Sequence, residues 1–181
     1  MLNLYGIRFT TADLAMELGV SKRSLYEHFD SKNDIIAAVF DEILRGLESE
    51  ITAITLDGNL DTVEKLKALM EIWPKAVGPF SALAVENTRR LLPGEWLKFE
   101  RYFQRKWDIV DQVVSQGIAA GQLRGVNTAV LRRLYMGGID QLLDYEFLND
   151  NNLTFKTAIA MMTEVLINGL AIAAASDPAE K

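Results

Sequence analysis

A stretch of twenty residues, 10–29 (TTADLAMELGVSKRSLYEHF), constrains the fold of this chain more than any other. Apolar residues recur at helical spacing between Leu14 and Leu18, after two threonines that can cap the N-terminus of a helix. Gly19 then ends this helix, because glycine adopts left-handed backbone dihedrals without a Cβ penalty and so permits a tight turn. Ser21 can cap a second helix. The stretch therefore predicts two short helices joined by a sharp turn.

The second of these helices has the features of a DNA recognition helix. We expect Leu25 and Phe29 to face inward, one turn apart, and Val20 to fill the core from the turn. Basic and hydroxyl side chains at the start of the helix are left outside. A helix of this kind enters a major groove with its N-terminus first. The alternative is an ordinary helical hairpin whose polar face is only solvated.

The pattern TT-x-x-LA-x-x-x-GVSK-x-SLY-x-HF-x-SK, from Thr10 to Lys32, resembles the DNA-binding head of the TetR family of bacterial transcriptional regulators. The resemblance implies an all-α fold in which a helix-turn-helix head binds a double-stranded DNA operator. It also implies a larger helical body that binds a small-molecule effector and forms a homodimer.

Resemblance and turn geometry together assign roles in the head. Lys22 and Arg23 lead the recognition helix and are the candidates for base edges, since guanine is the natural target of arginine. Ser24 can reach a base or a phosphate. Other residues are better placed for the DNA backbone, which sets register and not sequence: Thr10, Thr11, Ser21, Tyr26, His28 and Lys32.

One position departs from the family pattern. The family often has glycine where this chain has Arg23. Arg23 can add a base contact, or it can pair with Glu27 one helical turn away and be partly neutralised. We favour the base contact.

The charge of the chain is unusual for a protein that binds nucleic acid. The net charge is −6, although affinity for DNA depends on basic side chains that neutralise phosphates. Residues 1–32 hold four basic side chains (Arg8, Lys22, Arg23, Lys32) and four acidic ones (Asp13, Glu17, Glu27, Asp30). A neutral head favours a dimer with well-placed contacts over one that relies on a broad basic field.

The remaining periodic segments are all helical. From Ser31 a long helix is predicted to about Ile54, and further helices over 61–74, 80–92, 96–118, 127–148 and 154–175, with turns at 56–59, 93–94 and 121–127. This makes eight or nine helices, with a head over 1–46 and a body over 47–181. Residues 1–6 correspond only to the last turn of the family's first helix, so we expect residues upstream of Met1 or another source of apolar cover.

The sequence gives little support for an enzymatic function. The chain has no cysteine and a single histidine, His28. A Ser-His-Asp triad in the body and a histidine metal cluster are therefore excluded, and neither a metal nor a cofactor is expected. An enzyme that works through two carboxylates remains an alternative. The longest apolar run, 165–175, is too short to span a bilayer, and no signal peptide is recognisable. We expect a cytoplasmic protein without a membrane partner.

The body holds the residues expected to bind the effector. Binding pockets are mostly apolar with a few placed polar groups. Glu86, Asn87, Thr88 and Asp140 are polar residues on otherwise apolar helices. The candidates for the pocket lining, each of which can equally be a core residue, are Trp73, Phe80, Trp96, Phe99, Phe103, Trp107, Tyr135, Met136 and Met162.

The last two helices are expected to form the dimer interface. They combine small residues, which allow close approach of helices, with apolar area that needs a partner. The candidates are Gly138, Leu142, Met161, Val165, Gly169 and Ile172.

The sequence thus predicts a dimeric regulator, more specifically a repressor released from a pseudo-palindromic operator by a hydrophobic or aromatic effector. The rival hypothesis is a helical ligand-binding or protein-interaction bundle whose head no longer binds DNA.

Overall fold

The computed structural model describes residues 9–73 and 88–171. In these two ranges the structure consists of helices, turns and one isolated bridge between Leu123 and Ala171. The predicted all-α fold is confirmed. The predicted first helix, Phe80 and Ile172 lie outside the described residues, as does most of the predicted 80–92 helix, of which residues 88–91 are helical.

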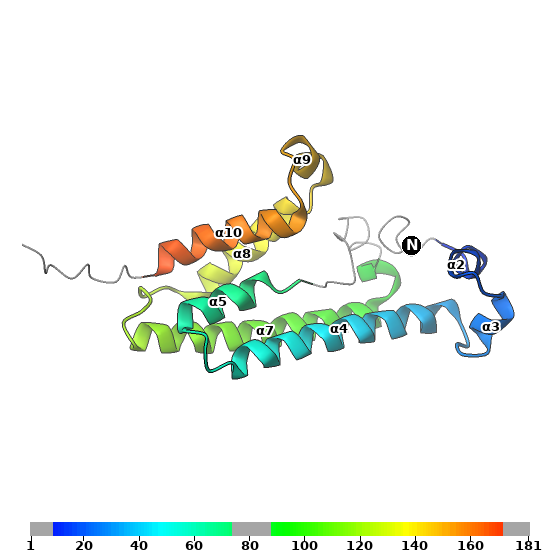
Figure 1. Cartoon of the computed structure of the whole chain (residues 1–181), viewed down its shortest axis with the longest axis horizontal. Coiled ribbons are helices and arrows are strands. Elements are labelled where there is room, and N and C mark those ends of the chain that lie inside the picture. Colours follow the sequence, from blue (N-terminus) through cyan, green and yellow to red (C-terminus); the bar gives the residue numbers. More distant parts are fainter. Residues whose placement is uncertain (1–8, 74–87, 172–181) are drawn as a thin grey trace, which may run out of the picture.

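Two short helices form the head at one end of the molecule (Figure 1). Helix α2 spans Thr11–Leu18 and α3 spans Lys22–Tyr26. Between them Gly19 has a φ of 65°, the left-handed conformation expected of a glycine that ends a helix. Ala15 and Leu25 are the buried residues of the two helices.

The expectation that Val20 fills the core of the head was wrong, and Leu18, at the end of the apolar run, is exposed as well. Leu18 is 58% exposed and Val20 is 43% exposed. Leu18 is the last residue of α2 and Val20 follows the turn, so the chain leaves the small apolar core at this point instead of covering it. Phe29 is half-buried, while Leu25 is buried as expected.

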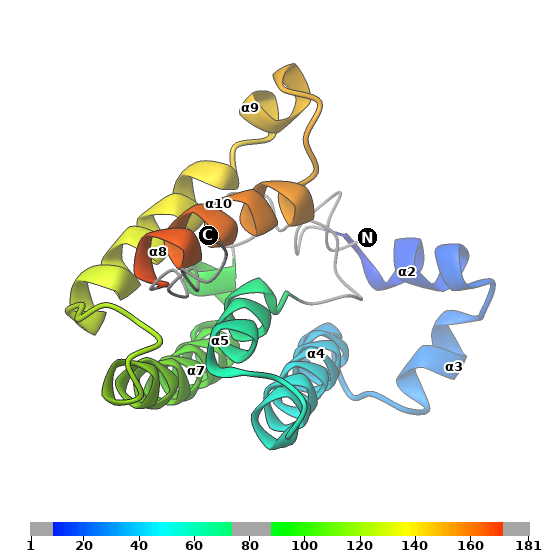
Figure 2. The same ribbon diagram turned by 60° about the vertical axis from the view of Figure 1, so that its left-hand side comes forward.

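Two long helices run side by side along the body (Figures 1 and 2). Helix α4 spans Lys32–Leu56 and α7 spans Pro93–Ala119. The expected boundary between residues 46 and 47 therefore lies inside α4, which is continuous from the head into the body. Pro93 is the first residue of α7 and not part of a turn, because its missing N–H has no partner to lose at a helix start.

Four further helices complete the body. Helix α5 spans Thr62–Glu71 and packs against α7 and against α10, which spans Phe155–Leu170. Helix α8 spans Thr128–Leu142 and packs beside α10 (Figure 2). Short α9 spans Tyr145–Asp150.

The predicted 127–148 helix is thus two helices. Asp144 accepts hydrogen bonds from the backbone N–H groups of Glu146 and Phe147, and this cap starts α9 after a break.

The core lies between α4, α5, α7, α8 and α10. Leu66, Leu69, Val110 and Val114 are fully buried, and Trp107 is nearly so. Helix α7 approaches its neighbours closely at Gly117, where a Cβ atom would lie 2.6 Å from Leu123 Cδ1 and 2.8 Å from Thr62 Cγ2. No helix in the described ranges is both long enough and apolar enough to cross a membrane.

Candidate functional sites in the head and the body

Side-chain caps position the polar residues of the head. Thr10 and Asp13 form a capping box at the start of α2: Asp13 N donates to Thr10 Oγ1 at 3.2 Å, and Thr10 N donates to Asp13 Oδ2 at 2.8 Å. The hydrogen bonds from Thr10 lower the pKa of the Asp13 carboxyl. Ser21 caps α3 by accepting from Ser24 N at 3.0 Å. Two of the predicted DNA contacts, Thr10 and Ser21, therefore also hold the helix starts in place.

A polar contact joins the two helices of the head. Thr11 Oγ1 on α2 lies 3.1 Å from Tyr26 Oη at the end of α3. Tyr26 is nevertheless about half exposed. This contact joins α2 to α3. It also brings together two residues that are predicted to contact the DNA backbone.

The outer face of α3 is basic and open. Lys22 and His28 are exposed, and Ser24 is half-buried. Arg23 forms an ion pair with Glu27, with Arg23 Nε 3.1 Å from Glu27 Oε1. In this structure, therefore, Arg23 pairs with Glu27. The sequence analysis favoured a base contact over this pairing. The pair is exposed, with 89% of the Arg23 side chain accessible, and pairs of this kind contribute at most about 1 kcal/mol. Arg23 can leave Glu27 at little cost, and its base contact stays a prediction.

Lys32 begins α4 beneath the head. Its Nζ lies 4.6 Å from the centroid of the Phe9 ring, and Phe9 is buried in the common core. The predicted DNA-contact residues thus lie on α2, on α3 and next to the ends of these helices, except for Lys32, which is the first residue of α4.

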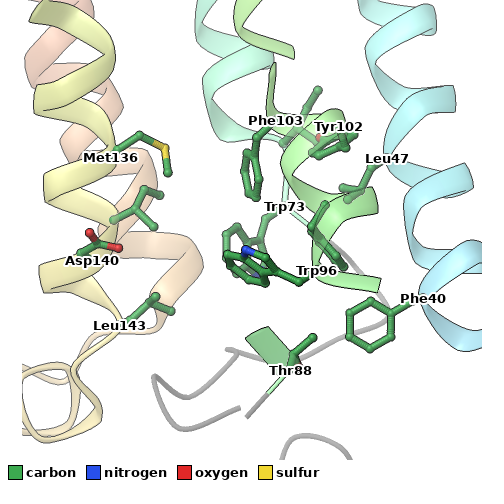
Figure 3. A pocket seen from close by; sticks show the side chains of 13 residues that line it. Phe40, Leu47, Trp73, Thr88, Trp96, Tyr102, Phe103, Met136, Asp140 and Leu143 are labelled. Atoms are coloured by element: carbon green, nitrogen blue, oxygen red, sulfur yellow. The ribbon is translucent and has the colours of Figure 1, made fainter. Parts of the chain in front are cut away.

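A cavity opens in the body between α4, α7 and α8 (Figure 3). It encloses about 750 Å³ of space, including its opening to solvent. Figure 3 shows Met136, Asp140 and Leu143 on the α8 side and Phe40 and Leu47 on the α4 side, with Trp73, Trp96 and Phe103 between them. The lining consists of Phe40, Leu47, Ile72, Trp73, Thr88, Trp96, Phe99, Tyr102, Phe103, Met136, Ile139, Asp140 and Leu143.

Only part of the predicted lining is at the cavity. Trp73, Trp96, Phe99, Phe103 and Met136 line it. The remaining predicted residues that the structure describes are elsewhere: Trp107 and Tyr135 are buried against each other with ring centroids 5.5 Å apart, and Met162 packs against Gly138.

The sequence analysis missed the residues that α4 contributes. Phe40 and Leu47 keep the spacing of an ordinary core stripe, which does not distinguish a cavity wall from a packed interior. Tyr102 was also missed, although it lies one turn from the predicted Phe99 on the same face of α7, and this spacing is a signal that would have found it.

Three polar groups line the cavity. Thr88 and Asp140 were both noted from the sequence as polar residues on apolar helices. The third is Tyr102, whose hydroxyl is buried without a hydrogen-bond partner among the described residues. Burial raises the pKa of this hydroxyl, so it stays protonated and available as a donor.

Ion pairs tie α7 to α4 beside the cavity. Lys98 Nζ lies 2.6 Å from Asp41 Oδ1 and 2.9 Å from Glu95 Oε2, and the hydrogen bond to Asp41 is the main reason why the pKa of Lys98 is raised. Arg105 pairs with Glu48 further along the same two helices.

Lys106 is the exception among the basic residues of α7. It is buried, with its Nζ 5.6 Å from the centroid of the Tyr135 ring, and burial lowers its pKa to about 7. No three side chains of the metal-ligating types gather in the part of the chain that is described.

An apolar face remains exposed on α8 and α10. Of the predicted interface residues, Met161, Val165 and Gly169 lie on this face, and Val165 is 74% exposed. Gly138 instead faces Met162 of the same chain, and Leu142 packs against the core. The sequence analysis missed Val130 and Leu134, which continue the exposed face on α8 with the spacing of one helical stripe.

Residues 1–39 match the sequence profile described as "Bacterial regulatory proteins, tetR family". The N-terminal head of this chain is therefore similar to that of TetR-family regulators. It is similar over 91% of its length to an uncharacterised HTH-type transcriptional regulator, YvaF, of Bacillus subtilis, with 25% identity across 87% of that protein. It is also 33% identical over 108 residues to the nucleoid occlusion factor SlmA of Vibrio vulnificus, a match that spans 59% of this chain and half of SlmA.

Solved structures of TetR-family regulators share the fold. PfmR of Thermus thermophilus superposes with a TM-score of 0.69 at 22% identity, over 92% of each chain. FadR of Bacillus subtilis, solved in complex with stearoyl-CoA, superposes with a TM-score of 0.63 at 19% identity, over 93% of this chain and 92% of FadR. The fold is therefore the one that these transcriptional regulators share, with a helix-turn-helix head and a larger helical body.

Proposed function

We propose that this protein is a homodimeric, sequence-specific repressor that an apolar small molecule releases from a pseudo-palindromic DNA operator. It acts by binding and catalyses no reaction, and it works in the cytoplasm, where the operator is. The head over residues 1–46 contacts DNA, and the body over residues 47–181 binds the effector and the second subunit.

The observation that carries this proposal is the path of α4. This helix starts at Lys32, a short turn after the recognition helix, and its residues Phe40 and Leu47 line the body cavity. Phe40 also contacts Phe99 of α7 edge-on, with ring centroids 5.3 Å apart. A molecule in the cavity therefore touches the same rigid element that carries the head.

Release follows if the effector favours one position of α4 over another. A ligand shifts an equilibrium only by the difference between its affinities for the two states. Two heads that must fit successive major grooves tolerate little change in spacing. An effector that prefers the cavity with α4 displaced thus weakens operator binding. The complex of FadR with stearoyl-CoA supports the idea that a body of this fold takes up a small molecule.

The dimer is supported by the apolar face of α8 and α10. Val130, Leu134, Met161 and Val165 are each more than half exposed on two adjacent helices. Large exposed apolar patches mark interaction sites. A two-fold axis through this face makes it contact its own copy, which explains why a pseudo-palindromic operator is expected.

Selection of binding duplexes from a random DNA pool at near-physiological salt tests the proposal. We expect an enriched inverted repeat whose half-sites are about one helical turn apart, or a multiple of it. No enrichment from folded, dimeric protein would overturn the proposal and favour a ligand-binding bundle whose head no longer binds DNA, a rival that the neutral charge of residues 1–32 supports.

Arg23→Ala then tests the base contact, with Arg45→Ala as the control. Arg45 pairs with Glu42 on α4 and is exposed like Arg23, so both variants lose one positive charge and one surface ion pair. We expect Arg23→Ala to weaken binding to the selected site roughly tenfold and to relax its sequence at one position, since a base contact contributes about 1–3 kcal/mol. Equal effects of the two variants would show that Arg23 acts only through its charge.

A further inference from the structure

The lining of the body cavity is unusually aromatic. Six of the residues that line it carry aromatic rings: Phe40, Trp73, Trp96, Phe99, Tyr102 and Phe103. The rings come from α4, from α7 and from the segment after α5, and they line the cavity opposite α8 (Figure 3). The face of an aromatic ring carries negative charge density and attracts cations, tryptophan most strongly.

The charge of the cavity lining also favours a cation. Asp140 is the only charged residue among the described lining residues, and it is exposed on α8 at the edge of the cavity. No ion pair of its carboxylate occurs in the described part of the chain, whereas Lys98 and Arg105 on the facing helix α7 are both taken up in ion pairs with α4.

Two further basic residues, Lys106 on α7 and Arg132 on α8, lie outside the cavity lining. Lys106 lies against the ring of Tyr135, and neither of these residues lines the cavity. Arg132 donates to Gln104 Oε1 at 3.2 Å and lies over the ring of Trp107, which is also outside the lining. An anionic molecule in the cavity would meet aromatic faces and a carboxylate, both of which disfavour it.

We infer that the effector of this protein is an apolar organic cation, an ammonium or a similar group on an aromatic or aliphatic frame. The aromatic rings enclose the frame and the positive charge, and Asp140 neutralises that charge at the mouth. The unpartnered Tyr102 hydroxyl is a donor for an acceptor atom on the same molecule. The inference rests on the proposed function only in taking this cavity as the effector site.

Three probes test it that share one para-butylbenzyl frame and differ in charge, and the first two also share the shape of the end group. They are para-butylbenzyltrimethylammonium, the hydrocarbon in which a quaternary carbon replaces its nitrogen, and para-butylphenylacetate. Binding to the full-length protein is measured by equilibrium dialysis without DNA. We expect the ammonium to bind several-fold more tightly than the hydrocarbon and roughly tenfold more tightly than the carboxylate, as cation–π attraction in a desolvated site allows.

Asp140→Asn isolates the carboxylate. It is expected to weaken ammonium binding roughly fivefold and to leave hydrocarbon binding unchanged, because a charge near the mouth acts through partly screened water. The control is Asp108→Asn, which makes the same change at an exposed α7 position outside the lining, where an amide can still accept the hydrogen bond from Gln104.

Three results would overturn the inference: a carboxylate that binds as tightly as the ammonium, equal effects of Asp140→Asn and Asp108→Asn, or no binding of any probe to folded protein. Because the dialysis contains no DNA, its outcome is independent of the operator selection. If the protein binds the ammonium but selects no DNA sequence, this inference stands and the proposed repressor function is wrong.

Discussion

In the head, polar side chains set the backbone around a very small apolar core, whereas in the body buried apolar side chains hold long helices together. The caps Thr10 and Ser21 begin α2 and α3, and each of these helices buries a single residue. Helix α7 alone buries residues along its whole length, from Phe99 to Gly117.

The difference has an energetic consequence. A side-chain cap contributes about 1 kcal/mol, while full burial of one large apolar side chain contributes about 1.5–3 kcal/mol. Most of the free energy of unfolding therefore comes from the body. Substitutions on the outer surface of the head can change DNA recognition while leaving stability nearly intact, and substitutions in the body cannot be treated in the same way.

Trp107→Ala and Leu18→Ala compare the two regions most directly. Trp107 is 1% exposed in the body, and Leu18 is 58% exposed in the head. We expect Trp107→Ala to lower the free energy of unfolding by about 3–5 kcal/mol and Leu18→Ala to change it by less than about 0.5 kcal/mol. Urea denaturation followed by circular dichroism measures both. Similar losses from the two substitutions would contradict the proposed division of stability.

Lys106→Met tests whether the buried amine of Lys106 lowers the free energy of unfolding of the body. Burial lowers the pKa of Lys106 to about 7, while the amine of the unfolded chain titrates near its ordinary value of 10.5. Between these two pH values the unfolded state binds more protons, so the contribution of Lys106 to the free energy of unfolding rises with pH. We expect Lys106→Met to stabilise the protein by about 2–4 kcal/mol at pH 7.

The gain from Lys106→Met should shrink as the pH rises toward 10. The difference between the variant and the unsubstituted protein is the quantity to follow, because other groups titrate equally in both. A gain that does not depend on pH between 7 and 10 would show that packing, and not the charge, is the cause.

One glycine in the head and one in the body allow two causes of smaller losses of stability to be distinguished. These causes are backbone strain and overpacking. Gly19 has a positive φ and open space around it, so Gly19→Ala strains only the backbone, by about 1–2 kcal/mol. Gly117 has no positive φ, but a Cβ there meets Leu123 and Thr62, so Gly117→Ala should cost about 1–3 kcal/mol through overpacking.

A second substitution at each site checks the two causes by thermal unfolding. Asparagine, which tolerates left-handed dihedrals, should recover part of the loss at Gly19. In a Leu123→Ala background, Gly117→Ala should cost less than it does in the unsubstituted protein, because the obstructing side chain is gone. If asparagine does not recover stability at Gly19, or Gly117→Ala costs the same in both backgrounds, the corresponding cause is wrongly assigned.

Local chemistry in the sequence was sufficient for the helix starts and for the head. Helix starts at Thr10 or Thr11, Ser21, Ser31, Asn127 and Thr154 were predicted. The structure has a side-chain cap at Thr10, Ser21, Ser31, Asn127 and Thr154, because a cap and the backbone N–H it binds lie within three residues. The turn at Gly19 depends on one residue's dihedrals. The family resemblance likewise rests on residues 10–32, a single continuous stretch.

Tertiary packing alone decided which side chains surround the cavity and which fill the core. Trp107 and Trp96 lie on the same predicted helix with the same apolar character, yet Trp107 packs against Tyr135 and Trp96 faces the cavity. Phe40 and Leu47 reach the cavity because α4 runs beside α7, a relation between segments more than forty residues apart. Periodicity reports which face of a helix is apolar, but it does not report whether a neighbouring helix fills the space against that face. The sequence by itself determined where most of the helices start and what kind of head this protein has, and the three-dimensional arrangement of the helices determined where a small molecule can bind.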